Sequence, residues 1–141
     1  MQDQPRLEDF PLRSFDKLRY GDTDRQGHVN NVVFATFLET GRCDLLDRAF
    51  GLSRLAAGNF VTARLELDFR AEIFWPGQVE IGTAVKTIGN SSVRVAQAVF
   101  QNGKLAATGE SVMVYLGQNK RPTSLPDDAR AELKALMLPC A

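Results

Sequence analysis

The stretch YGDTDRQGHVNNVVFATFLETGR, from Tyr20 to Arg42, passes from a polar turn pattern to a helical pattern. Its first part is a polar turn rich in Gly, Asn and Asp, and the rest has the apolar spacing of a helix. A helix that begins directly after a turn leaves its first backbone N–H groups unpaired, and its dipole adds partial positive charge there. Helix starts of this kind bind anions and carbonyls that gain negative charge. The stretch therefore predicts a site for a polarised carbonyl beside an acidic turn.

The helical part of this stretch continues toward residue 50. Asn30 can serve as N-cap, because its side-chain oxygen can accept a hydrogen bond from a first-turn N–H, and Gly51 can end the helix. Gly41 lowers helix propensity, so we expect it to permit close packing. We predict one helix of roughly five turns. Its apolar stripe consists of Val33, Phe34, Phe37, Leu38, Gly41, Leu45 and Ala49.

Strands account for most of the chain outside the helix. Residues 61–70 alternate between apolar and polar side chains and form the clearest strand pattern, with Val61, Ala63, Leu65, Leu67 and Phe69 on the apolar face. Asn102-Gly103 is the strongest hairpin signal, because a type I′ turn needs positive φ at both positions. Other strands are expected at 12–20, 79–85, 93–99 and 104–116.

These elements come in the order strand, long helix, four strands and a short tail helix that carries Leu133, Leu136 and Met137. We expect the four strands to form an antiparallel meander that bends around the helix, which makes this an α+β domain. The open sheet would leave an exposed edge. Dimerisation through the sheet is therefore expected.

Length and composition limit the class of protein. With 141 residues the chain fits a single domain, residues 1–141, with a loose lead-in over 1–11 and a C-terminal tail over 121–141. The 17 basic and 17 acidic side chains cancel, which argues against a nucleic-acid surface. No apolar run approaches the ~20 residues of a membrane span, and the first residues do not have the pattern of a signal peptide.

The two cysteines, Cys43 and Cys140, lie far apart in the sequence. Their spacing matches neither a metal site nor a disulfide framework. We expect Cys43 to be a small packing residue of the helix, and we expect no metal ligands. A reduced, cytoplasmic setting is the simplest interpretation.

The turn GDTDRQGHVNNVVF, the helix ending in ETGR and the order of elements resemble the hot-dog-fold acyl-CoA thioesterases, in the branch named after 4-hydroxybenzoyl-CoA thioesterase. The similarity extends from Phe15 to the RPTSLP loop at 121–126. It implies a hot-dog fold, in which a five-stranded antiparallel sheet wraps one long central helix. It also implies hydrolysis of an acyl-CoA or acyl-carrier-protein thioester by a homodimer or a dimer of dimers, with no cofactor.

The resemblance also assigns roles to single residues. In that family the second acid of a D-x-D pair is the catalytic carboxylate, acting as nucleophile or as general base for water, and Asp24 holds this position. The backbone N–H at the start of the helix polarises the thioester carbonyl, and Asn31 corresponds to it. Some relatives carry a histidine at the Asn31 position, whereas this chain has its only histidine at His28. The role of His28 therefore stays open between acid–base catalyst and structural residue.

This set of residues is sufficient for the chemistry. Thioester hydrolysis needs an attacking group and stabilisation of the oxyanion, which Asp24 and the Asn31 N–H can provide. Because the CoA thiolate is a good leaving group, a strong general acid is less necessary. No G-x-S-x-G motif is present, which argues against an α/β-hydrolase.

Other candidate residues have structural as well as functional interpretations. For Asp22 we adopt the structural one, a cap or turn former. Tyr20 could hydrogen-bond near Asp24 or pack at the end of the strand, and packing is favoured. Glu39 and Arg42 have the spacing of a surface ion pair on the helix. We place the following residues around the substrate, the last two from the partner chain: Tyr20, Gly27, Asn30, Phe60 and Thr62.

Several basic residues could meet the phosphates of CoA, although charges that alternate along strands usually face solvent. These residues are Arg64, Arg70, Lys120 and Arg121. Two other functions also stay open. A hot-dog enoyl-thioester hydratase would pair Asp24 with His28, but the G-H-V-N-N run fits thioesterases better. A non-catalytic acyl-thioester-binding module ranks last, because no DNA-binding segment is attached and the charge is balanced.

Overall fold

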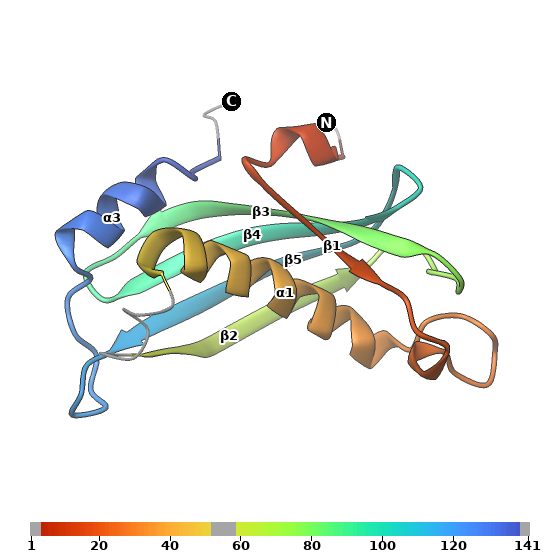
Figure 1. The fold of residues 1–141 in the computed structure, drawn as a ribbon, viewed down its shortest axis with the longest axis horizontal. Helices are drawn as coiled ribbons and strands as arrows, with labels where there is room; N and C mark the ends of the chain where they lie inside the picture. The colour runs from red at the N-terminus through yellow and green to blue at the C-terminus, as the bar shows by residue number, and fades with distance from the viewer. Residues whose placement is uncertain (1–3, 52–58, 139–141) are drawn as a thin grey trace.

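The computed structural model describes residues 4–51 and 59–138. Helix α1 lies along one face of a five-stranded antiparallel sheet, and the shorter helix α3 follows the last strand (Figure 1). This confirms the predicted α+β hot-dog architecture. The elements are the 3-10 turns Leu7–Asp9 and Tyr20–Asp22, helices α1 (Asn31–Phe50) and α3 (Asp127–Lys134), and strands β1 (Leu12–Lys17), β2 (Asn59–Phe69), β3 (Gln78–Ile88), β4 (Ser92–Gln101) and β5 (Lys104–Leu116).

Helix α1 begins and ends at the predicted residues. The Asn30 side chain accepts a hydrogen bond from the Val32 N–H at 3.1 Å, which is an N-cap, and the Gly51 N–H closes the last turn on Asp47. The predicted apolar stripe faces the sheet, with Phe34, Phe37, Leu38, Leu45 and Ala49 buried. Burial of this stripe, more than intrinsic propensity, holds the helix in place.

Gly41 brings α1 close to the sheet. A Cβ atom at this position would lie 2.6 Å from the Gln97 amide nitrogen and would also meet the Thr83 hydroxyl. The Gln97 side chain is fixed there, since it donates to the Leu38 carbonyl at 2.8 Å and to Thr83 at 3.1 Å. The expected role of Gly41 in close packing is confirmed.

The Arg42 side chain lies on the buried face of α1 and not on the exposed face. It is buried, and its guanidinium donates to Gln97 Oε1 at 3.4 Å. Burial lowers the pKa of this guanidinium below its usual value. Because Arg42 is buried, the predicted surface ion pair with Glu39 is wrong, although the Glu39 charge still acts on the guanidinium. Cys43, expected to pack, is exposed instead, and Cys140 lies outside the described residues.

The order of strands across the sheet differs from the predicted four-strand meander. The order is β1-β3-β4-β5-β2, so only β3, β4 and β5 are neighbours in sequence as well as in space. Asn102 and Gly103 have φ values of 52° and 79°, which confirms the predicted tight turn between β4 and β5. Strand β2 instead pairs with β5 at the far edge. The connection from β2 to β3, residues 70–77, must therefore cross the end of the sheet.

Strand β2 contains a bulge that the alternating sequence pattern does not reveal. Its register against β5 shifts between Thr62 and Arg64, so Phe60 and Leu65 both lie opposite inward-facing residues, Tyr115 and Ser111. Val61, predicted on the apolar face, lies on the other face. The predicted alternation holds only after the bulge, from Leu65 onward.

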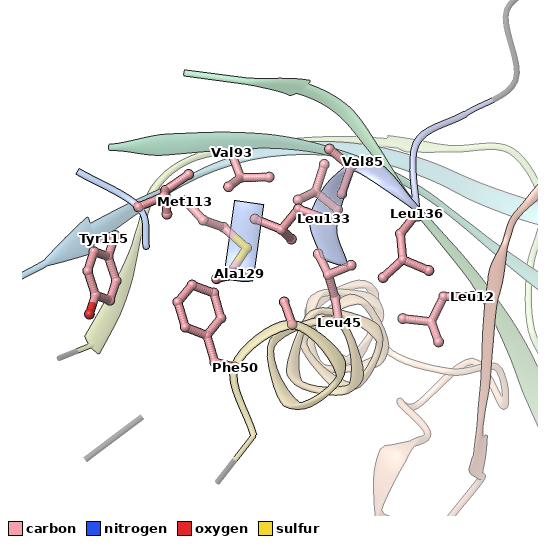
Figure 2. Packing of buried hydrophobic residues seen from close by; sticks show 13 residues of the cluster. Leu12, Leu45, Phe50, Val85, Val93, Met113, Tyr115, Ala129, Leu133 and Leu136 are labelled. Atoms are coloured by element: carbon pink, nitrogen blue, oxygen red, sulfur yellow. The ribbon is translucent and has the colours of Figure 1, made fainter. Parts of the chain in front are cut away.

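The core has one part at each end of α1. At the C-terminal end, Figure 2 shows Leu45 of α1 and Leu133 of α3 between the helices and the strands that carry Val85 and Val93. At the N-terminal end, Phe34, Phe37 and Leu38 pack against Val79, Ile81 and Val99. The start of α1 is thereby held rigidly on the sheet.

The N-terminal lead-in contacts the sheet through Phe10, while most of its other described residues are exposed. Residues 7–9 form a 3-10 turn, and the buried Phe10 ring covers Gly82 on the outer face of the sheet together with Ala84, Ala98, Phe100 and Leu105. Within residues 4–11 the lead-in therefore contains a 3-10 turn and one buried ring that attaches it to the sheet. No helix in the described part of the chain is long and apolar enough to cross a membrane.

Candidate active site

The polar turn before α1 is built on a buried aspartate. Strand β1 ends at Lys17, so Tyr20 belongs to a short 3-10 turn and not to the predicted strand. The Asp22 carboxylate accepts hydrogen bonds from the Arg19 N–H at 2.9 Å and from its guanidinium at 3.0 Å. The Asp22 carbonyl accepts from the Asn30 N–H. Asp22 therefore ties the two ends of the turn together, which confirms its structural role.

Asp24 and His28 form a pair inside this turn. One Asp24 carboxylate oxygen accepts from the Gln26 N–H at 2.9 Å, and the other lies 3.4 Å from His28 Nδ1. The backbone joins the same residues, since the Asp24 N–H donates to the His28 carbonyl. Gly27, with φ of 89°, makes the reversal between them possible. The turn thus holds the carboxylate against the imidazole.

Asn31 is the first residue of α1, and its N–H is free of protein partners in the described part of the chain. The Val32 N–H is taken by the Asn30 cap and the Val33 N–H by the Asn30 carbonyl. The Asn31 N–H also lies at the positive end of the helix dipole. It is therefore available to an oxygen from outside the chain.

A surface hollow of about 340 Å³ adjoins these groups. Two aromatic rings, Phe34 and Phe69, form part of its wall, with their centroids 5.1 Å apart. Asp24 is not one of its lining residues, but it contacts His28, which is. The lining residues are Gln26, His28, Val29, Asn31, Phe34, Phe69, Arg70, Ala71 and Glu72.

Comparison with known proteins shows the family of this chain. A family model described as the thioesterase-like superfamily matches residues 18–133, which includes the turn, α1 and all strands from β2 to β5. The chain belongs to the thioesterase-like superfamily. It is a thioester hydrolase of the hot-dog fold, as the resemblance in its sequence predicts.

Solved structures agree with this assignment. A thioesterase from Thermus thermophilus, complexed with coenzyme A and Zn, is 37% identical, with a TM-score of 0.83 over 92% of this chain and 96% of that one. The PA5185 protein of Pseudomonas aeruginosa PAO1 is 29% identical, with a TM-score of 0.88 over 97% and 99%. A predicted thioesterase from Bacillus stearothermophilus is 27% identical, with a TM-score of 0.83 over 92% and 98%.

The remaining predicted site residues of the thioesterase lie in different places. The Tyr20 ring packs edge-on against Trp75, with centroids 5.3 Å apart, which is the packing role that the sequence favours. Phe60 packs against Phe50 and Tyr115 at the opposite end of α1, and Thr62 is exposed on β2. A single chain therefore does not bring Phe60 and Thr62 to the hollow. Their role in an acyl pocket stays a prediction about a second copy.

The four basic residues that could meet the phosphates of CoA lie in different parts of the structure. Arg70 lines the hollow and donates to the Thr108 hydroxyl at 3.3 Å. Arg64 forms an ion pair with Glu66. Lys120 and Arg121 follow β5, whose last residue, Leu116, pairs with the start of β2 at the end of the sheet away from Phe69. Of the four, only Arg70 is near the hollow of its own chain.

Sequence reasoning missed the segment that follows β2. Glu72 lies 3.6 Å from His28 Nε2, and the Val29 N–H donates to the Ile73 carbonyl at 2.7 Å. No local signal in residues 70–74 reveals this contact, because it depends on the strand order. Within residues 4–51 and 59–138, no three His, Cys, Asp or Glu side chains are grouped so as to hold a metal ion.

Proposed function

We propose that the thioesterase hydrolyses an acyl-CoA to the free acid and CoA, with no metal or redox cofactor. The observation that carries the proposal is the free Asn31 N–H at the start of α1, beside the Asp24–His28 pair and a hollow with aromatic walls. The acyl carbonyl oxygen would accept a hydrogen bond from the Asn31 N–H. This bond strengthens as the oxygen gains negative charge, so it favours the transition state.

Asp24 provides the attacking group in this proposal, as nucleophile or as general base. Asp24 contacts His28 but does not itself line the hollow, which favours the general-base form, in which a water molecule lies between Asp24 and the carbonyl carbon. Asp24 takes a proton from this water while the new C–O bond forms. The tetrahedral intermediate then collapses, the C–S bond breaks, and CoA leaves as the thiolate.

Two features support an acyl-CoA as the substrate. Phe34 and Phe69 offer an apolar wall for the acyl group, and Arg70 offers a positive charge at the same hollow. The 37% identical relative from Thermus thermophilus was crystallised with coenzyme A. An acyl-carrier-protein thioester presents the same reacting bond and would use the same groups.

The Asp24–His28 pair also suits an enoyl-thioester hydratase, so the test must separate the two reactions. We expect a trans-2-enoyl-CoA to release free thiol, measured with a thiol reagent, in step with the loss of conjugated absorbance. Loss of absorbance without thiol release would identify hydration and contradict the proposal. A saturated acyl-CoA of equal chain length is the control, because it can only be hydrolysed.

We further propose that two copies pair through β2. This strand is an edge of the sheet, and it exposes Val61 by 43%, Leu65 by 38% and Phe69 by 50%. A long exposed edge strand with apolar side chains is a template for pairing with another strand. Antiparallel pairing of two β2 strands would bring the Phe60 and Thr62 end of one copy to the Phe69 end of the other. Each hollow would then be closed by the second copy.

This pairing predicts that Leu65→Lys separates the dimer and lowers hydrolysis. A lysine in the middle of β2 places a charge where the two strands would meet. Sedimentation velocity should show the wild type as a dimer or larger and the variant as a monomer. Phe15→Lys is the matched control, because Phe15 is 66% exposed on β1, the opposite edge. Wild-type protein that is monomeric and active would contradict the pairing.

A further inference from the structure

We propose that Glu72 is a positioning residue that holds His28, and through it Asp24, in the geometry that hydrolysis requires. The proposal rests on the proposed function of this site. His28 lies among three oxygen atoms from three different residues. Its Nδ1 atom is 3.4 Å from Asp24 Oδ2, and its Nε2 atom is 3.0 Å from Gln26 Oε1 and 3.6 Å from Glu72 Oε1.

Asp24 lies on one side of the imidazole ring, at Nδ1, and Gln26 and Glu72 lie on the other side, at Nε2. Asp24 and Gln26 belong to the same turn as His28, so they move with it if the turn shifts. Two residues of another part of the chain, the connection after β2, contact the ring. Phe74 lies edge-on to the imidazole with centroids 6.3 Å apart, and Glu72 provides the polar contact. Glu72 therefore helps to fix the ring relative to the sheet. A ring held on both sides cannot rotate toward the hollow without leaving one of its two carboxylates.

The structure holds Glu72 itself in place through its backbone. Its neighbour Ile73 is buried and accepts a hydrogen bond from the Val29 N–H at 2.7 Å, and Phe74 forms a β-bridge with His28. The Gln101 side chain adds two bonds to the Phe74 backbone, to its N–H at 3.0 Å and to its carbonyl at 2.7 Å. The segment that carries Glu72 is thus joined both to the catalytic turn and to the end of β4.

A contribution to fold stability does not account for this contact. The Glu72 side chain is 62% exposed, and ion pairs with such exposure contribute little to stability. Its effect should instead appear in the geometry of the site. Small displacements of reacting groups have large effects on rate, and Asp24 is held by the ring that Glu72 contacts.

The test is a double-mutant cycle with Glu72→Ala and His28→Ala, measured as thiol release from an acyl-CoA. In the wild-type background we expect Glu72→Ala to lower kcat by about tenfold, the scale of coupling between residues in contact, with KM nearly unchanged. In the His28→Ala background the same change should have no further effect, because the ring through which Glu72 acts is absent. Glu72→Ala should leave the midpoint of chemical unfolding unchanged in both backgrounds, because the Glu72 side chain is exposed.

Glu132→Ala is the matched control, because Glu132 is an exposed carboxylate on α3 that neither lines the hollow nor belongs to β2. It should leave kcat unchanged. An unchanged kcat in Glu72→Ala, or an equal loss with and without His28, would overturn the positioning role. Either result leaves the proposed function standing as long as Asp24→Asn still abolishes thiol release, so the two proposals fail separately.

Discussion

Asp24→Asn is expected to lower kcat/KM for acyl-CoA hydrolysis by roughly 10²- to 10⁴-fold, the range that a positioned acid or base contributes. The amide cannot take a proton from water and cannot act as a nucleophile. The fold should persist, because the asparagine side-chain oxygen can still accept the Gln26 N–H that Asp24 accepts at 2.9 Å. Steady-state thiol release and chemical unfolding measure the two effects.

The control for this substitution is Asp47→Asn on α1. Asp47 is exposed and lies in the last turns of the helix, away from the hollow. Asp47→Asn removes one negative charge, as Asp24→Asn does, so any effect of net charge on CoA binding would appear in both variants. If Asp24→Asn retained wild-type kcat, the carboxylate would have no part in the reaction and the mechanism would be wrong.

Asn31→Pro is expected to lower kcat by roughly 10²- to 10³-fold, the typical effect of removing one oxyanion donor. Proline removes the backbone N–H that the proposal assigns to the carbonyl oxygen. Asn31 is the first residue of α1, where proline is well tolerated because this N–H makes no bond within the helix. Asn30 is already extended, with φ of −61° and ψ of 138°, as a residue before proline must be.

Asn31→Ala completes this experiment. It removes the side chain and keeps the N–H, so we expect kcat close to that of the wild type. Circular dichroism should show equal helix content in both variants. Wild-type activity in both Asn31→Pro and Asn31→Ala would mean that the donor is a different group. An equal loss of activity in both variants would assign the effect to the side chain.

The sequence carries the signals for α1 and the turn before it because both are local. Helical spacing, a cap at Asn30 and a stop at Gly51 act within a few residues of each other, and each is present in the structure. The same holds for Asn102-Gly103, whose two positive φ values define a turn that needs no other part of the chain. The resemblance added the family, and the family model agrees with it.

Most of the misses depend on contacts between distant segments. The position of β2 beside β5 is decided by tertiary packing, and it carries residues 70–74 across the end of the sheet to His28. Arg42 has the spacing of a surface residue, but a buried amide at Gln97 accepts its hydrogen bond. Phe10 follows a polar segment and still covers the outer face of the sheet. Periodicity and spacing describe single elements and do not contain this information.

The groups assigned to the reaction and its positioning come from three segments of the chain. The turn provides Asp24 and His28, α1 provides the Asn31 N–H, and the connection after β2 provides Glu72. The turn and the start of α1 are adjacent in sequence, the connection after β2 meets them at one hollow, and the exposed β2 edge lies beside it. If two copies pair at this edge, the acyl group would bind between them, and assembly and activity would be lost together.

Hydrolysis by Asp24 is best tested by thiol release from a panel of short-, medium- and long-chain and aromatic acyl-CoAs, with Asp24→Asn beside the wild type. We expect the wild type to release thiol from at least one acyl-CoA, with one free acid formed for each thiol, and the variant to release almost none. No release from any acyl-CoA, or equal release by both proteins, would contradict hydrolysis by Asp24.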